Sequence, residues 1–205
     1  MNARLPVLVS SIGEPAAQAR AIGIIRDEHR SLAAVMHAWM HALAAARRAG
    51  TGADPALMRA IVHYVRQFPV ELHHPKEEEQ LFRRLRERTT SCHAELDELE
   101  RQHERDHELV AALERQVEVL VAAEGAARAQ ATLVLEEAVT AYAAFLWEHL
   151  GREEGVILPA AQRFLLAEDW AAIDHAFAAN RDPNFNGAYR EYRQLFARIV
   201  NLTPA

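Results

Sequence analysis

Apolar side chains recur through most of this chain at the three- and four-residue spacing of an amphipathic α-helix. The stretch from residue 93 to 123 is typical, with Leu96, Leu99, Val110 and Leu113 on one face of the predicted helix. The same periodicity predicts four long helices, at residues 22–48, 55–88, 93–123 and 127–158. No segment has the pattern of a β-hairpin or a βαβ unit. Four long helices joined by short breaks predict an all-α fold, an up-down-up-down four-helix bundle.

The breaks between these helices carry recognisable end signals. Gly50 follows the first helix and is typical of a helix C-terminus. Asp54 precedes a proline and suits the N-cap of the second helix. Pro69 and Pro75 lie inside the second helix, and we expect each to bend it, because proline removes a backbone donor. The fourth helix is expected to stop near Pro159.

The segments on either side of the predicted bundle are shorter and weaker in pattern. Residues 1–21 are expected to form an N-terminal arm, residues 22–160 the bundle, and residues 161–205 a C-terminal extension. The extension should hold two short helices, at 168–179 and 186–202. Their apolar faces are Trp170, Ile173 and Phe177 on the first, and Tyr189, Tyr192, Leu195, Phe196 and Ile199 on the second. We expect these faces to cap the bundle, with pairing of two chains as the alternative, so the chain is a monomer or a homodimer.

Composition supports the helical prediction and narrows the chemistry. Ala accounts for 40 of the 205 residues and Gly for 8, which favours helix. The net charge of −6 argues against a nucleic-acid partner, since such proteins are usually basic. Cys92 is the one cysteine, which excludes an internal disulfide and a Cys-rich zinc site. The 11 histidines point instead to a metal site built from nitrogen and oxygen ligands.

The sequence shows no sign of membrane insertion or export. No apolar run reaches the roughly 20 residues that a membrane-spanning helix needs. The apolar stretch Leu5–Ile12 is short for a signal peptide and has no typical cleavage site. We therefore expect a cytoplasmic protein with no membrane partner.

Histidine and glutamate occur together on two of the predicted helices as His-x-x-x-Glu. The spacing of four residues places both side chains of a pair on one helix face. Pairs with this spacing are His73/Glu77 and His74/Glu78 on the second helix and His149/Glu153 on the fourth. Spacing alone does not select between the two overlapping pairs on the second helix.

The pattern is repeated in the two halves of the chain. His29 precedes His73 by 44 residues, and His103 precedes His149 by 46. Each half supplies a histidine on one helix, followed by His-x-x-x-Glu on the next. Two metal ions could each take two imidazoles from this set and share two bridging carboxylates. Imidazole with carboxylate suits iron, manganese or zinc.

The segments that carry these residues resemble the hemerythrin-like, or HHE cation-binding, family. They are Asp27–Arg30, His73–Phe82, Glu100–His103 and His149–Pro159. They occur in the family's order and spacing, over about residues 22–160. The resemblance implies a four-helix bundle around two non-haem iron ions, which an oxo or hydroxo group can bridge. Manganese or zinc is the alternative that the same donors would accept.

The resemblance also selects among the candidate ligands. The family's second-helix motif has a phenylalanine nine residues after its ligand, and Phe82 follows His73 by nine, which favours His73/Glu77 over His74/Glu78. The implied metal ligands are His29, His73, Glu77, His103, His149 and Glu153. His107 is a candidate seventh ligand, because oxygen-carrying hemerythrins have two histidines four apart on the third helix. The remaining histidines are interpreted as ordinary surface or core residues: His37, His41, His63, His74, His93 and His175.

Two other metal motifs compete with this interpretation. The segment His103–His107 spells the zinc-protease pattern H-E-x-x-H, with Glu104 as the would-be base, but it lacks a third ligand and a substrate-holding strand. A ferritin-like centre would need Glu-x-x-His pairs, which occur as Glu71/His74 and Glu100/His103. The fourth helix has Leu146 where that centre would require a glutamate.

The resemblance implies a protein that binds or senses O₂, NO or peroxide at its iron pair. Two other uses of such a centre stay open. One is an enzyme that turns over peroxide or NO, and the other is an iron donor of the kind that repairs iron–sulfur clusters. A metal-free helical interaction module is a further alternative from a different class. No catalytic residue is identified from the sequence.

Overall fold

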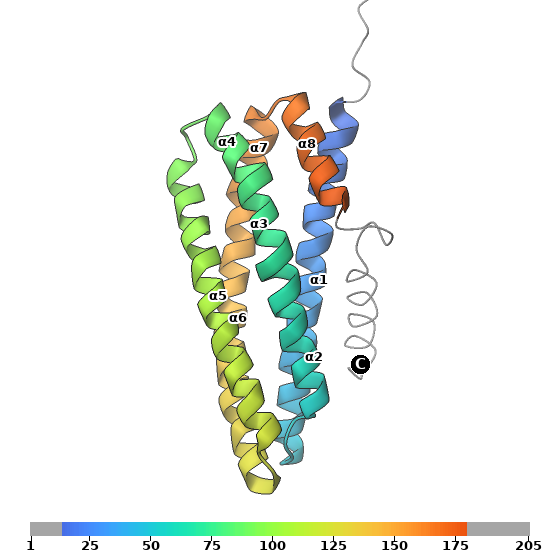
Figure 1. Ribbon diagram of the computed structural model, residues 1–205, viewed down its shortest axis with the longest axis vertical. Coiled ribbons are helices and arrows are strands. Elements are labelled where there is room, and N and C mark those ends of the chain that lie inside the picture. The colour runs from blue at the N-terminus through green and yellow to red at the C-terminus, as the bar shows by residue number, and fades with distance from the viewer. Residues whose placement is uncertain (1–13, 180–205) are drawn as a thin grey trace, which may run out of the picture.

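Four long helical stretches run up and down the length of the molecule (Figure 1). The computed structural model describes residues 14–179, so the helix expected at 186–202 lies outside the described residues. The first stretch is α1 (Glu14–Ala49), and the third is α5 (His93–Ala122). The second comprises α2 (Pro55–Val65), η1 (Arg66–His73), α3 (His74–Lys76), η2 (Glu77–Phe82) and α4 (Arg83–Arg88). The fourth comprises α6 (Gly125–Arg152), η3 (Glu153–Ile157) and α7 (Leu158–Phe164), and α8 (Ala167–Ala178) follows it. Residues 14–179 contain no strand, and the predicted all-α bundle is confirmed.

The first helix begins earlier than the pattern predicts. α1 starts at Glu14, inside the segment expected to form an arm. Proline is tolerated in the first turn of a helix, so Pro15 does not prevent this start. Ala17 and Ala21 are buried, and their packing extends the helix beyond the range that its larger apolar side chains mark.

The connection between α1 and α2 uses the end signals that the sequence predicts. Gly50 has φ of 65°, the left-handed conformation that favours glycine at a helix C-terminus. The Asp54 side chain accepts a hydrogen bond of 2.8 Å from the Ala56 N–H and caps α2. The turn is therefore specified by local residues.

A proline lies in or beside each of the π-helical segments η1, η2 and η3. Pro69 lies within η1, Pro75 just before η2, and Pro159 just after η3. A π-turn bonds an N–H to the carbonyl five residues back, as Leu158 does to Glu153, and it relieves the crowding around a ring that has no N–H. The expectation that the fourth helix stops at Pro159 is therefore wrong, because the chain stays helical to Phe164.

A layer of buried polar side chains divides the apolar core into two clusters. The lower cluster, toward the α1–α2 connection, includes Trp39, Val65, Val110 and Leu146. The upper cluster, toward the α8 end, includes Ile25, Phe82, Leu96 and Ile157. Between them lie Glu28, His29, His73, His74, Glu77, Gln102, His103, Asp106, His149 and Glu153, which we call the polar layer. Every long stretch passes from one cluster through this layer to the other, so the bundle brings the layer to one level.

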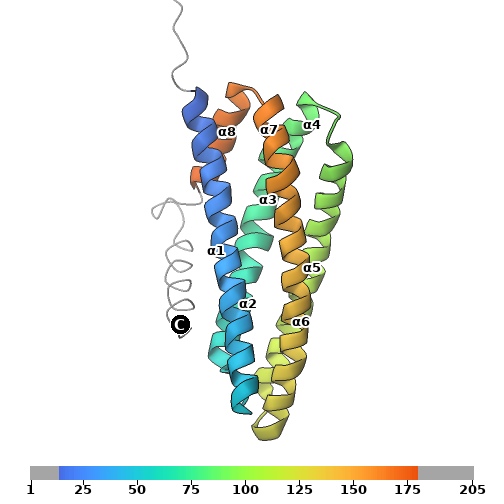
Figure 2. The same cartoon turned by 180° about the vertical axis from the view of Figure 1, so that it is seen from behind.

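Helix α8, the last helix of the described residues, packs on the upper cluster beside α1 (Figures 1 and 2). Trp170, Ile173 and Phe177 are buried there, as expected for a helix that caps the bundle. Cys92 is buried in the same cluster, and burial raises the pKa of its thiol, which makes it less reactive.

The long helices bury one face and leave the other in contact with solvent. Along residues 14–179, no helix is both long and apolar enough to cross a membrane.

Candidate metal centre

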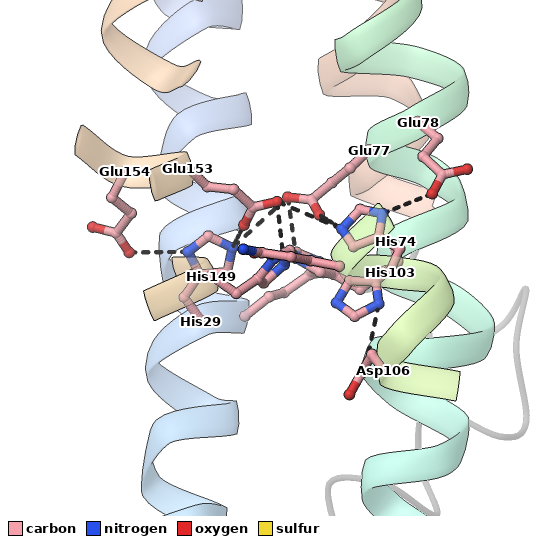
Figure 3. A network of polar contacts seen from close by, with 12 residues as sticks. His29, His74, Glu77, Glu78, His103, Asp106, His149, Glu153 and Glu154 are labelled. Atoms are coloured by element: carbon pink, nitrogen blue, oxygen red, sulfur yellow. Dashed lines mark hydrogen bonds and ion pairs between the residues drawn. The ribbon is translucent and has the colours of Figure 1, made fainter. Parts of the chain in front are cut away.

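The polar layer brings together the six residues that the family resemblance implies as metal ligands. His29, His73, Glu77 and Glu153 form one group, and His103 and His149 join Glu77 in a second group. Within each group the potential ligand atoms all lie within 4.8 Å of one another, and every member is buried. His29 comes from α1, while the other members come from the second, third and fourth stretches. Four chain segments that are distant in sequence thus converge on one centre (Figure 3).

The two central glutamates divide their oxygens between the two groups. Glu77 Oε1 lies 3.2 Å from His73 Nε2, and Glu153 Oε2 lies 3.3 Å from His29 Nε2. The other two oxygens face the opposite group, with Glu153 Oε1 3.4 Å from His149 Nε2 and Glu77 Oε2 3.8 Å from His103 Nε2. Each carboxylate therefore offers one oxygen to each set of imidazoles, as a carboxylate that bridges two ions must.

His74 also belongs to the second group, although the sequence interpretation treated it as an ordinary residue. Its side chain is 3% exposed and its ring stacks on His103 with ring centroids 4.1 Å apart. In a regular α-helix, neighbouring residues point in directions about 100° apart, so His73 and His74 would face the core at different angles. The π-helical turns on either side of them change this relation. Pro69 and Pro75, which flank the pair, were the available sequence signal.

Nine ligand atoms in this centre are buried without a hydrogen-bond partner among the described residues. They are Nε2 of His29, His73, His74, His103 and His149, and both carboxylate oxygens of Glu77 and of Glu153. Buried polar atoms are almost always satisfied, because each unsatisfied one costs about 1–3 kcal/mol. Nine such atoms at one place, all of them good metal donors, fit a site for cations and do not fit a packed protein core.

The other ring nitrogens of the histidines are held by partners outside the centre. The Nδ1–H groups donate to carboxylates over 2.7–2.9 Å in three cases: His29 to Glu154, His73 to Glu28 and His103 to Glu78. The fourth, His149, donates to the side-chain oxygen of Gln102 over 3.1 Å. A carboxylate can only accept, so these bonds place the proton on Nδ1 and leave the Nε2 lone pair facing inward. This is the arrangement that orients histidines for metal binding.

These outer partners follow the same two-fold repeat as the ligands. Glu28 and Gln102 each precede the single histidine of their half, and each bonds the second histidine of the same half. Glu78 and Glu154 each follow the central glutamate of their half, and each bonds the single histidine of the other half. The repeat therefore extends beyond the ligands to the residues that orient them.

His74 and Asp106 break this two-fold repeat. Asp106 is 1% exposed, and its Oδ2 lies 3.6 Å from His74 Nδ1. Asp106 is therefore the outer neighbour of His74, although this distance is longer than a hydrogen bond. Burial raises the pKa of Asp106 to about 6, against the opposing effects of the neighbouring Tyr142 hydroxyl and the charge of His103. In the other half, the corresponding positions are occupied by Leu32 and Leu150. A charged residue on the apolar stripe of α5, three residues after His103, was the sequence signal for Asp106.

His107, the candidate seventh ligand, lies outside both groups. It is exposed on α5, so the structure does not bring it to the centre. One helical turn separates His103 from His107, but α5 stays regular here, and Asp106 occupies the buried face instead. Glu104 is exposed as well, which leaves the zinc-protease pattern unassembled. The ferritin-like alternative is also not assembled, because Glu71 is exposed.

In the metal-free centre, protons compensate the two buried carboxylates. Burial disfavours a charge on His73, but the charge of Glu77 and the hydrogen bond to Glu28 raise its pKa to about 10. Burial acts in the same way on His103, whose pKa the carboxylates of Glu153 and Glu78 raise to about 9. Burial and the charges of neighbouring histidines lower the pKa of His74 well below its usual value. Burial likewise disfavours a charge on His29, but its hydrogen bonds to Glu153 and Glu154 raise its pKa well above the usual value. Three of the potential ligands are therefore protonated at neutral pH, and cations would replace these protons.

Comparison with known proteins was made against families, curated proteins and solved structures. Residues 20–161 match the family described as "Hemerythrin HHE cation binding domain". The match covers all four helical stretches and every residue of the polar layer, and it ends before α8. No curated protein and no solved structure gave a significant match.

Replacing an outer partner should weaken metal binding without removing a ligand. In the Glu78→Gln variant, the amide can present a donor to His103 and no longer enforces its tautomer, so we expect metal affinity to fall about 10–100-fold. The matched control is Glu79→Gln, which makes the same change at the next, exposed residue. Competition with a chelator of known affinity measures both variants, and equal affinities would contradict the role of Glu78.

The stability of the metal-free protein should fall as the pH rises above neutral. The pKa values of His73 and His103 in the folded state, about 10 and about 9, exceed the roughly 6.5 of an unfolded histidine. Their stabilisation is complete below about pH 6.5 and is lost as the pH rises through the folded-state values. In the presence of a chelator, we expect Tm to be lower by at least about 3 °C at pH 9.5 than at pH 7. A level or rising Tm over this interval would contradict the protonation of both residues.

Proposed function

Because the chain belongs to the hemerythrin HHE cation-binding family, we propose that its polar layer holds two non-haem iron ions and that this iron pair binds a small molecule, O₂, NO or peroxide. The observation that carries the proposal is the set of nine inward-facing donor atoms with no partner among the described residues. In a metal-free helical interaction module, protons on the histidines would compensate only some of these atoms, and the burial of the others would remain costly. The donors comprise five imidazole nitrogens and four carboxylate oxygens, a mixture that suits iron.

The two metal positions would receive unequal numbers of protein donors. His29 and His73 would hold the first ion together with one oxygen from each central glutamate, and these four donors form one group. His74, His103 and His149 would hold the second ion with the remaining oxygens. Octahedral coordination would leave more open positions at the first ion, so we propose that the exogenous molecule binds there.

The surroundings of the first position favour a small, weakly polar molecule. In the repeat, Leu150 corresponds to His74 of the second position, and Leu32 corresponds to Asp106. Leu32 is buried in the lower cluster, and Leu150 packs against that cluster. His29, His73, Glu77 and Glu153 are each no more than 3% exposed. A molecule of a few atoms suits such a place better than an organic substrate does.

When bound, iron would exchange electrons with a molecule such as O₂, NO or peroxide. The residues of the chain orient the ions, exclude bulk water and set the local charge. Four outer side chains carry carboxylates, on Glu28, Glu78, Glu154 and Asp106. They increase the basicity of the imidazoles and thereby stabilise the more highly charged, oxidised ions. The outer partners of His73 and His149 differ, a carboxylate and an amide, so the two ions would differ in potential.

Elemental analysis provides the first test. Protein produced with added iron should contain two ions per chain, and the double variant His73→Ala/His149→Ala should lose most of this metal, because it removes one nitrogen donor from each position. The matched control is His107→Ala, an exposed histidine of the same region, which should retain the full content. Purified wild-type protein without metal, or a double variant with unchanged content, would contradict the proposal.

Ligand binding provides the second test. Reduced, iron-loaded protein mixed with NO in a stopped-flow instrument should change its absorption spectrum with a stoichiometry of about one NO per iron pair, since the first position has the open coordination. Separate mixing with O₂ and H₂O₂ distinguishes the possible uses. A stable, reversible spectrum supports binding or sensing, while continuous loss of peroxide supports an enzyme. Absence of a spectral response to all three molecules would contradict small-molecule binding.

A further inference from the structure

Helix α8 lies outside the region shared with the family, yet it reaches the metal centre. The family match ends at residue 161, and α8 runs from Ala167 to Ala178. It descends from the upper end of the bundle beside α1, and it also packs against η2 on the second stretch (Figures 1 and 2). These two parts of the bundle carry His29 and Glu77, so α8 lies on the side of the first metal position.

The last turn of α8 contacts a potential ligand directly. Phe177 is fully buried, and its ring meets the ring of His73 edge to face, with centroids 6.1 Å apart and an interplanar angle of 79°. Phe68 of η1 stacks on the same histidine at 6.2 Å. His73 is 2% exposed. Of the two phenylalanine rings that cover it, Phe68 belongs to the second stretch, while Phe177 lies outside the four long stretches.

A second contact joins the end of α8 to the second stretch, next to Glu77. The Lys76 ammonium donates a hydrogen bond of 3.1 Å to the Ala176 carbonyl, in the last turn of α8, where a cation is favoured. Lys76 follows His73 by three residues and directly precedes Glu77. This bond therefore ties α8 to the segment that carries both potential ligands.

Ion pairs hold α8 to both sides of the bundle. Asp174 pairs with Arg20 of α1 at 2.6 Å. Asp169 pairs with Arg88 of α4 at 2.8 Å and also caps the start of α8 by accepting a bond from the Leu166 N–H. These exposed and half-buried pairs contribute little stability individually, but they fix the position of the helix.

We propose that α8 is a cover for the first metal position, and that Phe177 is the residue that limits access of exogenous molecules to His73 and its ion. The proposal rests on the proposed function for the identity of the ions, but the covering of His73 does not depend on which metal is bound. Exchange of ions or of molecules larger than a few atoms then requires α8 to move. A small neutral molecule can pass during brief fluctuations of the packed side chains.

The test compares two alanine variants of the full chain. Phe177→Ala removes the ring that contacts His73. Leu96→Ala removes a fully buried side chain of the same cluster from α5, outside the cover, and so controls for loss of packing. With protein loaded with iron, or with cobalt if iron does not bind, we expect the ion to pass to a chelator at least about tenfold faster from Phe177→Ala than from wild type. Leu96→Ala should release it at a rate near that of wild type.

A second measurement needs no bound metal. Deuterium exchange at the ring C2 position of each histidine, read by mass spectrometry in metal-free protein, reports the access of solvent to individual imidazoles. In Phe177→Ala, exchange should accelerate at His73 and stay unchanged at His103, whose ring contacts are with Phe82 and other histidines. Circular dichroism confirms that both variants are folded.

The outcomes distinguish failure of the proposed cover from failure of the proposed metal-binding function. Wild-type protein that binds no metal would contradict the proposed function, while the exchange measurement would still decide the role of Phe177. Equal acceleration at His73 in Phe177→Ala and Leu96→Ala, or none in either, would overturn the proposal. Selective acceleration in Phe177→Ala would support it, and Phe177→Leu, which restores most of the volume, should then behave more like wild type.

Discussion

The rest of the structure depends on one constraint, the burial of nine nitrogen and oxygen atoms at one place. These atoms face one another and have no hydrogen-bond partner among the described residues. Such atoms are tolerable in a protein interior only when cations or protons compensate them. In the metal-free state, protons on His73 and His103 serve this purpose. The polar layer is therefore a site whose occupancy and protonation are linked, and the bundle is built to keep it dry.

The two apolar clusters and the outer hydrogen bonds stabilise this buried polar layer in different ways. The clusters above and below the polar layer supply the burial that holds four helices together, and they confine the polar side chains to one level. The outer acceptors, such as Glu28 and Gln102, fix the orientation of each imidazole. Because each acceptor adjoins a ligand in sequence, the same helical turn that presents one ligand also orients another. Only the pair His74 and Asp106 departs from this scheme, and it makes the two metal positions unequal.

Much of this organisation could be predicted from the sequence. The four stretches follow from apolar periodicity, and the repeat of a single histidine followed by His-x-x-x-Glu leads to His29, His103, His149 and Glu153. The family resemblance adds the choice of His73 and Glu77 over the overlapping pair His74 and Glu78. The errors arise where the backbone departs from a regular α-helix or a side chain could face either way. The family resemblance selected His73 over His74, whereas the structure buries both imidazoles between two π-helical segments. Spacing made His107 a candidate, but the face of α5 on which it lies is exposed.

By itself, the sequence determined which helices form and which pairs of residues share a helix face, because hydrophobic period, capping and i,i+4 spacing are local properties. Only the tertiary structure decided how the two carboxylates divide their oxygens, which acceptor orients each histidine, and that Phe177 of α8 encloses His73. These relations join atoms of different helices, and they depend on the level and rotation at which the helices pack. That packing is set by the whole core and by the π-helical turns, so no single stretch of sequence encodes it.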